Sequence, residues 1–254
     1  MLGMPSMIEL ESVADHVKLC GELGLSFVEL NTNFPNQQLH LLKPAELKDM
    51  ADSAGIFYTI HLNDELYVAD FNPQVARGYC DCVLEAIDFA KKIGAPVLNM
   101  HLCVGAKYTM PDRKVFFYEA YEADYLAQIV KFRNLCTHAI GDAPIRICVE
   151  NTTGYLPFQK RSIAALLESP VFGLTYDIGH NQCADNADEA FILSYEQRLH
   201  HLHLHDVLGD KDHLPFGEGE MPLADYIALA QNRTAVIEVK TVAGLCKAVD
   251  YLKG

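Results

Sequence analysis

The chain has 254 residues, half of them hydrophobic and 21% charged, so a large folded core is expected and long disorder is excluded. Its 34 acidic residues against 20 basic ones give a net charge of −14, which argues against broad electrostatic binding to nucleic acid or an anionic membrane. No CxxC pair occurs among its eight cysteines, and no apolar stretch approaches the roughly 18 residues of a membrane span. We therefore expect a cytoplasmic protein that does not bind membranes.

Short apolar or β-branched runs alternate with helix-period segments along the whole chain. Eight strands are predicted at residues 2–8, 27–31, 57–62, 96–102, 145–151, 173–178, 199–207 and 235–240. Helices are predicted at residues 12–23, 44–54, 72–93, 111–140 (one bent helix or two), 159–168, 188–197, 222–231 and 243–252. This alternation predicts an α/β fold, a single (β/α)8 TIM barrel domain over residues 1–254. An open doubly wound sheet is the alternative, but no GxGxxG follows an early strand to support it.

Polar side chains gather where the predicted strands end. They are His61, His101, Glu150, Asp177 with His180, His203 between His201 and His205, and Glu238 with Lys240. Strand side chains alternate between two faces, so His201, His203 and His205 share one face. Because a barrel collects its functional groups at the C-terminal ends of its strands, we expect this set to point into the barrel mouth.

Burying so many ionisable groups is costly unless they are paired or hold a metal. Each residue has a structural alternative: a strand-end histidine can be hydrogen-bonded in the core, Asp177 can cap the loop after its strand, and Glu150 or Glu238 can pair with Lys240. Together, on six strand ends, they indicate a metal centre. The mixture of oxygen and nitrogen donors suits one divalent ion (Mn, Zn, Co, Mg or Fe(II)), with no organic cofactor.

Several of these residues stand in short motifs that follow one another in a fixed order. The motifs are Glu150-Asn151, Asp177-Ile178-Gly179-His180, His203-Leu204-His205-Asp206, His213-Leu214-Pro215-Phe216-Gly217-Glu218-Gly219 and Ile237-Glu238-Val239. They resemble the xylose isomerase-like TIM barrel superfamily, which includes sugar-phosphate isomerases and epimerases, ketose 3-epimerases, inosose dehydratase-like proteins and endonuclease IV. The resemblance spans nearly the whole chain but does not select one member.

The resemblance implies a site for one divalent ion, formed here by Glu150, Asp177, His203 and Glu238. His203 is preferred because the superfamily's ligand stands three residues before the aspartate that is Asp206 here; His205 is the alternative. In the epimerase branch the two glutamates also serve as acid and base on opposite faces of the substrate. Glu150 and Glu238 are therefore the expected catalytic residues.

The remaining residues are expected to contact the substrate or to orient the ligands. They are His61, His101, His180, His213 and Lys240. His180 is similar to a histidine that contacts substrate in the epimerases, and the four histidines match further metal ligands of the endonuclease branch. That branch also needs an aspartate two residues before His213, where this sequence has Lys211. A cation at this position opposes a three-metal site.

A proton beside a carbonyl is too weakly acidic for an unaided carboxylate, and a divalent ion that chelates two substrate oxygens would stabilise the enediolate. The sequence therefore predicts a metal-dependent isomerase or epimerase of a small carbohydrate, either a ketose, a polyol or a sugar phosphate. The alternatives are a dehydratase on the same site, a phosphodiesterase acting on abasic DNA, and a non-enzymatic binding protein. The loop Gly217-Glu218-Gly219 fits either close approach to substrate or a tight turn. Homo-oligomerisation is left open.

Overall fold

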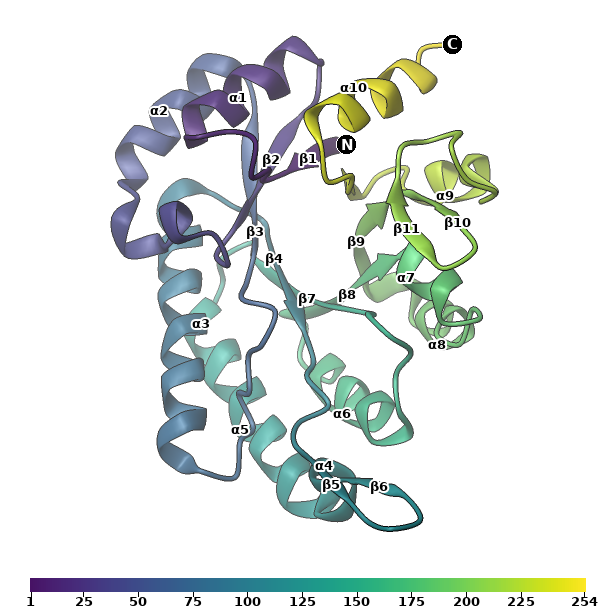
Figure 1. Ribbon diagram of the computed structural model, residues 1–254. Helices are drawn as coiled ribbons and strands as arrows, with labels where there is room; N and C mark the ends of the chain where they lie inside the picture. Colours follow the sequence, from purple (N-terminus) through teal and green to yellow (C-terminus); the bar gives the residue numbers. More distant parts are fainter.

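The computed structural model describes residues 1–254 and closes eight parallel strands into one barrel (Figure 1). The strands are β1 (Leu2–Pro5), β2 (Phe27–Asn31), β3 (Phe57–His61), β4 (Val97–His101), β7 (Arg146–Glu150), β8 (Phe172–Asp177), β9 (Leu199–Leu204) and β12 (Thr234–Ile237). The last strand, β12, pairs with both β9 and β1, so the sheet has no open edge. The predicted (β/α)8 barrel is thus confirmed, and the open sheet is excluded.

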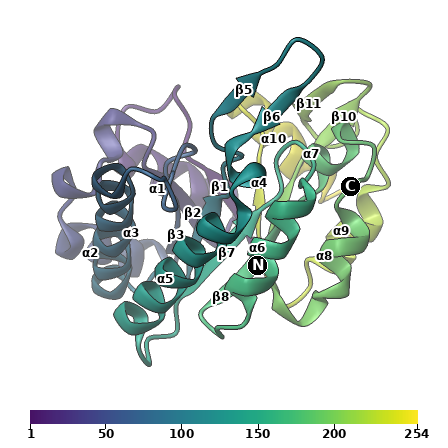
Figure 2. The same ribbon diagram turned by 90° about the horizontal axis from the view of Figure 1, so that it is seen from below.

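Helices cover the outside of the barrel (Figures 1 and 2). They are α1 (Val13–Glu22), α2 (Pro44–Ala54), α3 (Pro73–Ile93), α5 (Glu122–Ile140), α6 (Pro157–Leu167), α8 (Glu189–Ser194), α9 (Leu223–Leu229) and α10 (Val242–Tyr251), with the short α4 (Phe117–Ala120) and α7 (Ile178–Cys183) between them. Sequence signals set their ends: the Ser12 side chain caps α1, and Pro44 and Pro73 occupy first positions. None of the helices combines the length and the apolar composition that crossing a membrane requires.

The predicted helix over residues 111–140 is wrong in its first part. Residues Lys107–Thr109 (β5) and Lys114–Phe116 (β6) form an antiparallel hairpin that protrudes from the barrel (Figure 2), and the helices begin only at Phe117. The backbone N–H of Met110 donates to the carbonyl of Arg113 at 2.8 Å, which closes a turn around Pro111. A proline that starts a turn has the same local signature as one that starts a helix.

The seventh strand is shorter than predicted. It ends at Leu204. After it come Asp206–Leu208 (β10) and a turn, and Lys211–Leu214 (β11) then pairs antiparallel with β10 at the barrel mouth. The first strand likewise ends at Pro5, and Glu238 lies just beyond the end of β12. These changes move the ends of elements but leave the eightfold alternation intact.

Strand side chains alternate between the helices and the barrel interior. Outward residues such as Leu30, Ile60, Leu98 and Val149 are buried and apolar, and pack under the helices. The inward residues are largely polar, and include Glu29, Thr59, Asn99, Thr175, His201 and Thr234. The barrel interior therefore contains a polar layer directly below the mouth, where the predicted site lies.

Candidate metal centre

Four of the predicted ligands meet at the C-terminal mouth of the barrel. Glu150 ends β7, Asp177 ends β8, His203 lies near the end of β9 and Glu238 follows β12. The sheet register places Asp177 beside His203 and His203 beside Val236, two residues before Glu238. One donor atom from each of the four residues lies within 4.8 Å of all the others. We call this group, Glu150, Asp177, His203 and Glu238, the metal centre.

The imidazole of His203 points one nitrogen into this group. Its Nδ1 lies 3.0 Å from Glu238 Oε2, 3.3 Å from Glu150 Oε1 and 3.8 Å from Asp177 Oδ2. The rival histidine, His205, lies on the far side of Asp177 and does not belong to the group. The structure therefore brings His203, and not His205, together with Glu150, Asp177 and Glu238.

The donor set fits a divalent cation because its charges are buried and incompletely satisfied. Glu150, Asp177 and His203 are at most 1% exposed, and both ring nitrogens of His203 and Oε2 of Glu238 have no hydrogen-bond partner. Burial alone would raise the pKa of both glutamates, but the charge of His203 lowers each well below its ordinary value. Three buried carboxylates around one imidazole are costly without a further cation. Oxygen and imidazole donors suit a divalent metal ion.

Asp177 is held in place by its neighbours. Its Oδ1 accepts a hydrogen bond from the backbone N–H of His180 at 2.6 Å, which caps the first turn of α7. His205 Nδ1 accepts the backbone N–H of His213 at 2.8 Å, so its Nε2 carries the proton and donates to Asp177 Oδ1 at 3.0 Å. Gly179 leaves space for the His205 ring beside Asp177, because a Cβ at position 179 would overlap that ring. His205 thus orients the Asp177 carboxylate without belonging to the centre.

Glu150 is anchored from the opposite side. Its Oε2 accepts a hydrogen bond from Asn99 Nδ2 and lies 3.2 Å from His101 Nε2 and 3.4 Å from His61 Nε2. Burial would lower the pKa of His61, but the adjacent Glu150 carboxylate raises it to about 9. His61, His101 and Glu150 form a second group whose donor atoms lie within 4.8 Å of one another.

The other predicted residues surround the centre. His180 Nδ1 lies 3.3 Å from Asp177 Oδ2 and 3.4 Å from Glu150 Oε1; although burial opposes the shift, these carboxylates raise its pKa to about 10. Burial lowers the pKa of His213 to about 4, and its Nδ1 lies 3.1 Å from the carbonyl oxygen of Glu238. Lys240 Nζ lies 2.9 Å from Glu238 Oε1. The group His180, His205 and His213 is a third cluster of potential donors.

The glycine loop after His213 serves the local fold. Asp206 is buried, and its carboxylate accepts hydrogen bonds from the backbone N–H groups of four residues, Val207, Gly217, Gly219 and Met221, at 2.9–3.1 Å. Gly217 has a φ of +83°, and a Cβ at Gly219 would overlap the Asp206 carboxylate. Of the two interpretations of this loop, the structure supports the tight turn.

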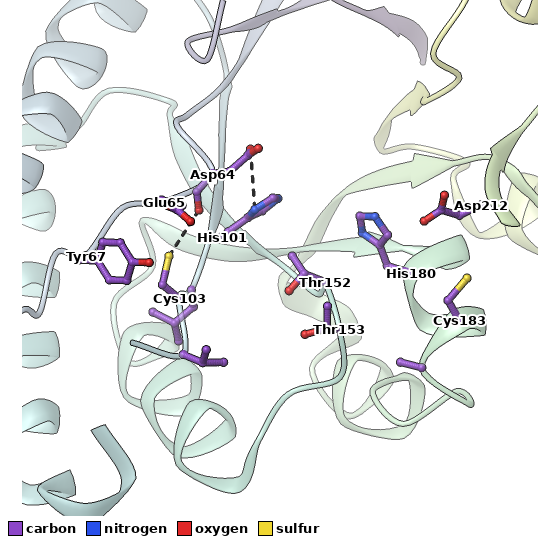
Figure 3. Close-up of a pocket in the computed structure, with 13 residues that line it drawn as sticks. Asp64, Glu65, Tyr67, His101, Cys103, Thr152, Thr153, His180, Cys183 and Asp212 are labelled. Atoms are coloured by element: carbon purple, nitrogen blue, oxygen red, sulfur yellow. Dashed lines mark hydrogen bonds and ion pairs between the residues drawn. The ribbon is translucent and has the colours of Figure 1, made fainter. Parts of the chain in front are cut away.

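A cavity of about 570 Å³ opens beside the centre (Figure 3). Its lining includes the carboxylates of Asp64, Glu65 and Asp212, the hydroxyls of Tyr67, Thr152 and Thr153, and the imidazoles of His101 and His180. No lysine or arginine lines it. Apart from the two histidines, these residues were not predicted. They come from loops after different strands, so only the assembled mouth brings them together.

Sequence reasoning also missed Glu29 and Asn99, and it assigned no role to His201. Glu29 lies on β2 with its Oε1 3.1 Å from His203 Nε2, although the two residues are far apart in the sequence. Residues 27–31 alternate, and Glu29 is the acidic residue on the face opposite Val28 and Leu30. A charged residue on the interior face of a predicted barrel strand is unusual, and this pattern could have identified Glu29 as a candidate site residue.

Several proteins of known fold are similar to this chain. The structure of a D-tagatose 3-epimerase-like protein has a TM-score of 0.81 at 21% identity, covering 99% of this chain and 95% of that chain. D-Psicose 3-epimerase from Clostridium cellulolyticum H10, solved with D-tagatose, has a TM-score of 0.77 at 12% identity. The match covers 99% of this chain and 96% of that chain. An IolI protein with a bound zinc atom has a TM-score of 0.75 at 12% identity. The match covers 99% of this chain and 95% of that chain. At these identities the likeness shows the fold.

The sequence comparisons identify the family as well as the fold. An uncharacterised protein of Methanocaldococcus jannaschii is 24% identical over 232 residues, which cover 84% of this chain and 76% of that protein. Residues 17–245 match the xylose isomerase-like TIM barrel family, a span that runs from α1 to α10 and includes all four residues of the metal centre. The chain therefore belongs to the xylose isomerase-like TIM barrel family.

Proposed function

We propose that this protein is a divalent-metal-dependent isomerase or epimerase of a small, unphosphorylated carbohydrate. The observation that carries the proposal is the buried metal centre, in which three carboxylates face the unpaired Nδ1 of His203. Glu150, Asp177, His203 and Glu238 would hold the ion. When bound, the ion would act as a Lewis acid that stabilises negative charge developing on substrate oxygens.

Glu150 and Glu238 would move the proton. They stand on β7 and just after β12, which are separated in the barrel by β8 and β9, so their carboxylates approach the centre from different sides. Glu238 is the more accessible of the two, with 13% of its side chain exposed against 1% for Glu150. Its Oε2 is free of hydrogen bonds, whereas Glu150 Oε2 is occupied by Asn99. We therefore assign the abstraction of a proton from one face of the substrate to Glu238, which would release it to solvent. Glu150 would take up a proton from solvent and donate it to the other face.

The cavity supports an uncharged substrate. Carboxylates and hydroxyls accept hydrogen bonds from sugar hydroxyls, but the three carboxylates of Asp64, Glu65 and Asp212 repel a phosphate. The nearby cations are already paired: Lys240 with Glu238, and His180, whose pKa is raised to about 10, with Asp177 and Glu150. The ketose 3-epimerases of similar fold also support a free ketose as the substrate class. We expect KM to be at least tenfold higher for phosphate esters than for the matched free sugars, which corresponds to about 1.4 kcal/mol.

The proposal is tested by metal analysis of the purified protein and by NMR in deuterated water. The metal-loaded protein is incubated with free ketoses, polyols and their phosphate esters. An Asp177→Ala variant, treated in the same way, is the control. Exchange of a carbon-bound proton with inversion indicates an epimerase, transfer to the adjacent carbon an isomerase, and loss of water a dehydratase. Absence of all three in the metal-loaded protein contradicts the proposed function, and a lower KM for the phosphate esters contradicts the proposed substrate class.

A phosphodiesterase is the second candidate. The clusters His61–His101–Glu150 and His180–His205–His213 favour it, because they offer places for further ions beside the metal centre. The net charge of −14 and the acidic cavity oppose binding to a phosphate backbone. More than one metal ion per chain, together with nicking of an abasic duplex at low salt, would favour this second function over the first.

A further inference from the structure

A buried carboxylate lies directly below the metal centre, on the opposite wall of the barrel. Glu29 of β2 is 2% exposed, and neither lysine nor arginine contacts it. Its Oε1 lies 3.1 Å from His203 Nε2, and its Oε2 lies 3.1 Å from His201 Nε2 and accepts a hydrogen bond from Thr59 Oγ1 at 2.9 Å. The carboxylate therefore faces two imidazoles and one hydroxyl.

These contacts fix where the protons are. An ionised carboxylate only accepts hydrogen bonds, and a nitrogen lone pair 3.1 Å away would be repelled by it. His203 must therefore carry hydrogen on Nε2, where it makes an ion-pair contact with Glu29 rather than a hydrogen bond. Its Nδ1, 3.0 Å from Glu238 Oε2, is the nitrogen at which a metal ion would replace hydrogen. The same argument gives His201 a hydrogen on Nε2, so its Nδ1 accepts from Thr234 Oγ1 at 2.6 Å. Both rings therefore keep hydrogen on Nε2.

We propose that Glu29 is a positioning residue for the metal centre, because it holds His203 in the Nε2–H form with Nδ1 as the ligand atom. This inference rests on the proposed metal centre. If the pocket around Glu29 served stability alone, apolar side chains would fill it at lower cost, since a buried carboxylate without lysine or arginine carries a large desolvation penalty. A carboxylate beside the second nitrogen of a ligating histidine orients the ring and strengthens the ligand.

Glu29→Gln is the direct test because it preserves the shape of the side chain. The single amide oxygen cannot accept from all three neighbours, and the amide NH2 must place a donor against a donor. We expect the affinity for Zn²⁺, measured by chelator competition at constant pH, to fall by about 10–100-fold. Asp188→Asn is the matched control, since Asp188 is an equally buried carboxylate that bonds the backbone N–H of Tyr155. It should change the zinc affinity by less than about twofold, the change expected of a residue that does not support the ligands.

A second measurement does not depend on how the variant folds. Long-range ¹H–¹⁵N correlation spectra of the zinc-loaded wild-type protein report which nitrogen of each histidine carries hydrogen. We expect His203 to show Nε2–H and a zinc-bound Nδ1. Ligation through Nε2, unchanged zinc affinity in Glu29→Gln, or an equal loss in Asp188→Asn overturns the inference. Because both readouts omit substrate, a failure of the proposed reaction leaves them unaffected.

Discussion

Replacing Glu238 with glutamine tests the proton transfer at the metal centre. Glu238 Oε1 lies 2.9 Å from Lys240 Nζ, and Oε2 lies 3.0 Å from His203 Nδ1 without a hydrogen bond. In Glu238→Gln the ammonium of Lys240 will hold the amide oxygen, because an NH2 group beside it would place donor against donor. The amide nitrogen will then occupy the position of Oε2, where it can neither accept a proton nor bind an ion.

The size of the effect follows from the role of the lost group. Removing a general base costs about 10²–10⁴-fold in turnover, which is about 2.7–5.5 kcal/mol because each tenfold change is worth about 1.36 kcal/mol. The metal dissociation constant should also rise, since a ligand position is lost. In the double variant Glu238→Gln/Lys240→Met the amide is free to turn its oxygen toward the centre. Metal affinity should then partly recover, whereas turnover should stay low.

The assay is the rate of proton exchange and product formation in deuterated water, at saturating metal. Glu218→Gln is the control: Glu218 is exposed, pairs with Lys247 at 2.7 Å and lies in the loop near the mouth, so its loss should leave turnover within about twofold. Near wild-type turnover in metal-loaded Glu238→Gln would refute the assignment of the base. If Glu150→Gln is equally active, His180 becomes the next group to test.

Three further predictions concern metal, loop and pH. Asp177→Ala should abolish metal binding while leaving the circular dichroism spectrum unchanged, because the barrel core lies below the site; retained metal would contradict this. Asp206→Asn keeps one acceptor oxygen for four backbone donors, so the free energy of unfolding in urea should fall by about 2–4 kcal/mol, and a loss below about 1 kcal/mol would show that the loop rearranges freely. The buried Nε2 of His16 accepts the backbone N–H of Met7 at 2.8 Å, and burial lowers the pKa of His16 below 6.5. As pH falls below about 6.5 the unfolded chain binds a proton that the folded chain resists, so stability is lost there by up to about 1.4 kcal/mol per pH unit. His16→Gln should flatten this slope between pH 7.5 and 5.5, and an equal slope in both proteins would exclude His16 as the cause.

The barrel and the strand-end residues of the site could be predicted from local patterns. Residues 57–61 and 97–101 are short apolar runs that end in histidine, and the flanking helices begin and end at proline, serine and glycine signals. Parallel strands in a closed barrel all end at the same mouth, so knowing that Glu150 and Asp177 lie at strand ends, and Glu238 next to one, is enough to bring them together. The period of two along a strand also predicts that His203 points inward.

Tertiary structure alone decided which atoms meet. His203 and His205 share one face of the predicted strand, but β9 ends at Leu204, and only His203 joins the group with Glu150, Asp177 and Glu238. Local periodicity does not distinguish the two histidines. Glu29 contacts His203 across the barrel although 174 residues separate them (203 − 29), and no local signal pairs them. The acidic cavity likewise forms from separate segments, the loops at Asp64 and Thr152 and the strand β11 at Asp212. The physical reason is that the alternation of strands and helices is set by short-range backbone preferences, whereas contacts across the mouth depend on barrel closure, loop folding and the satisfaction of buried charge.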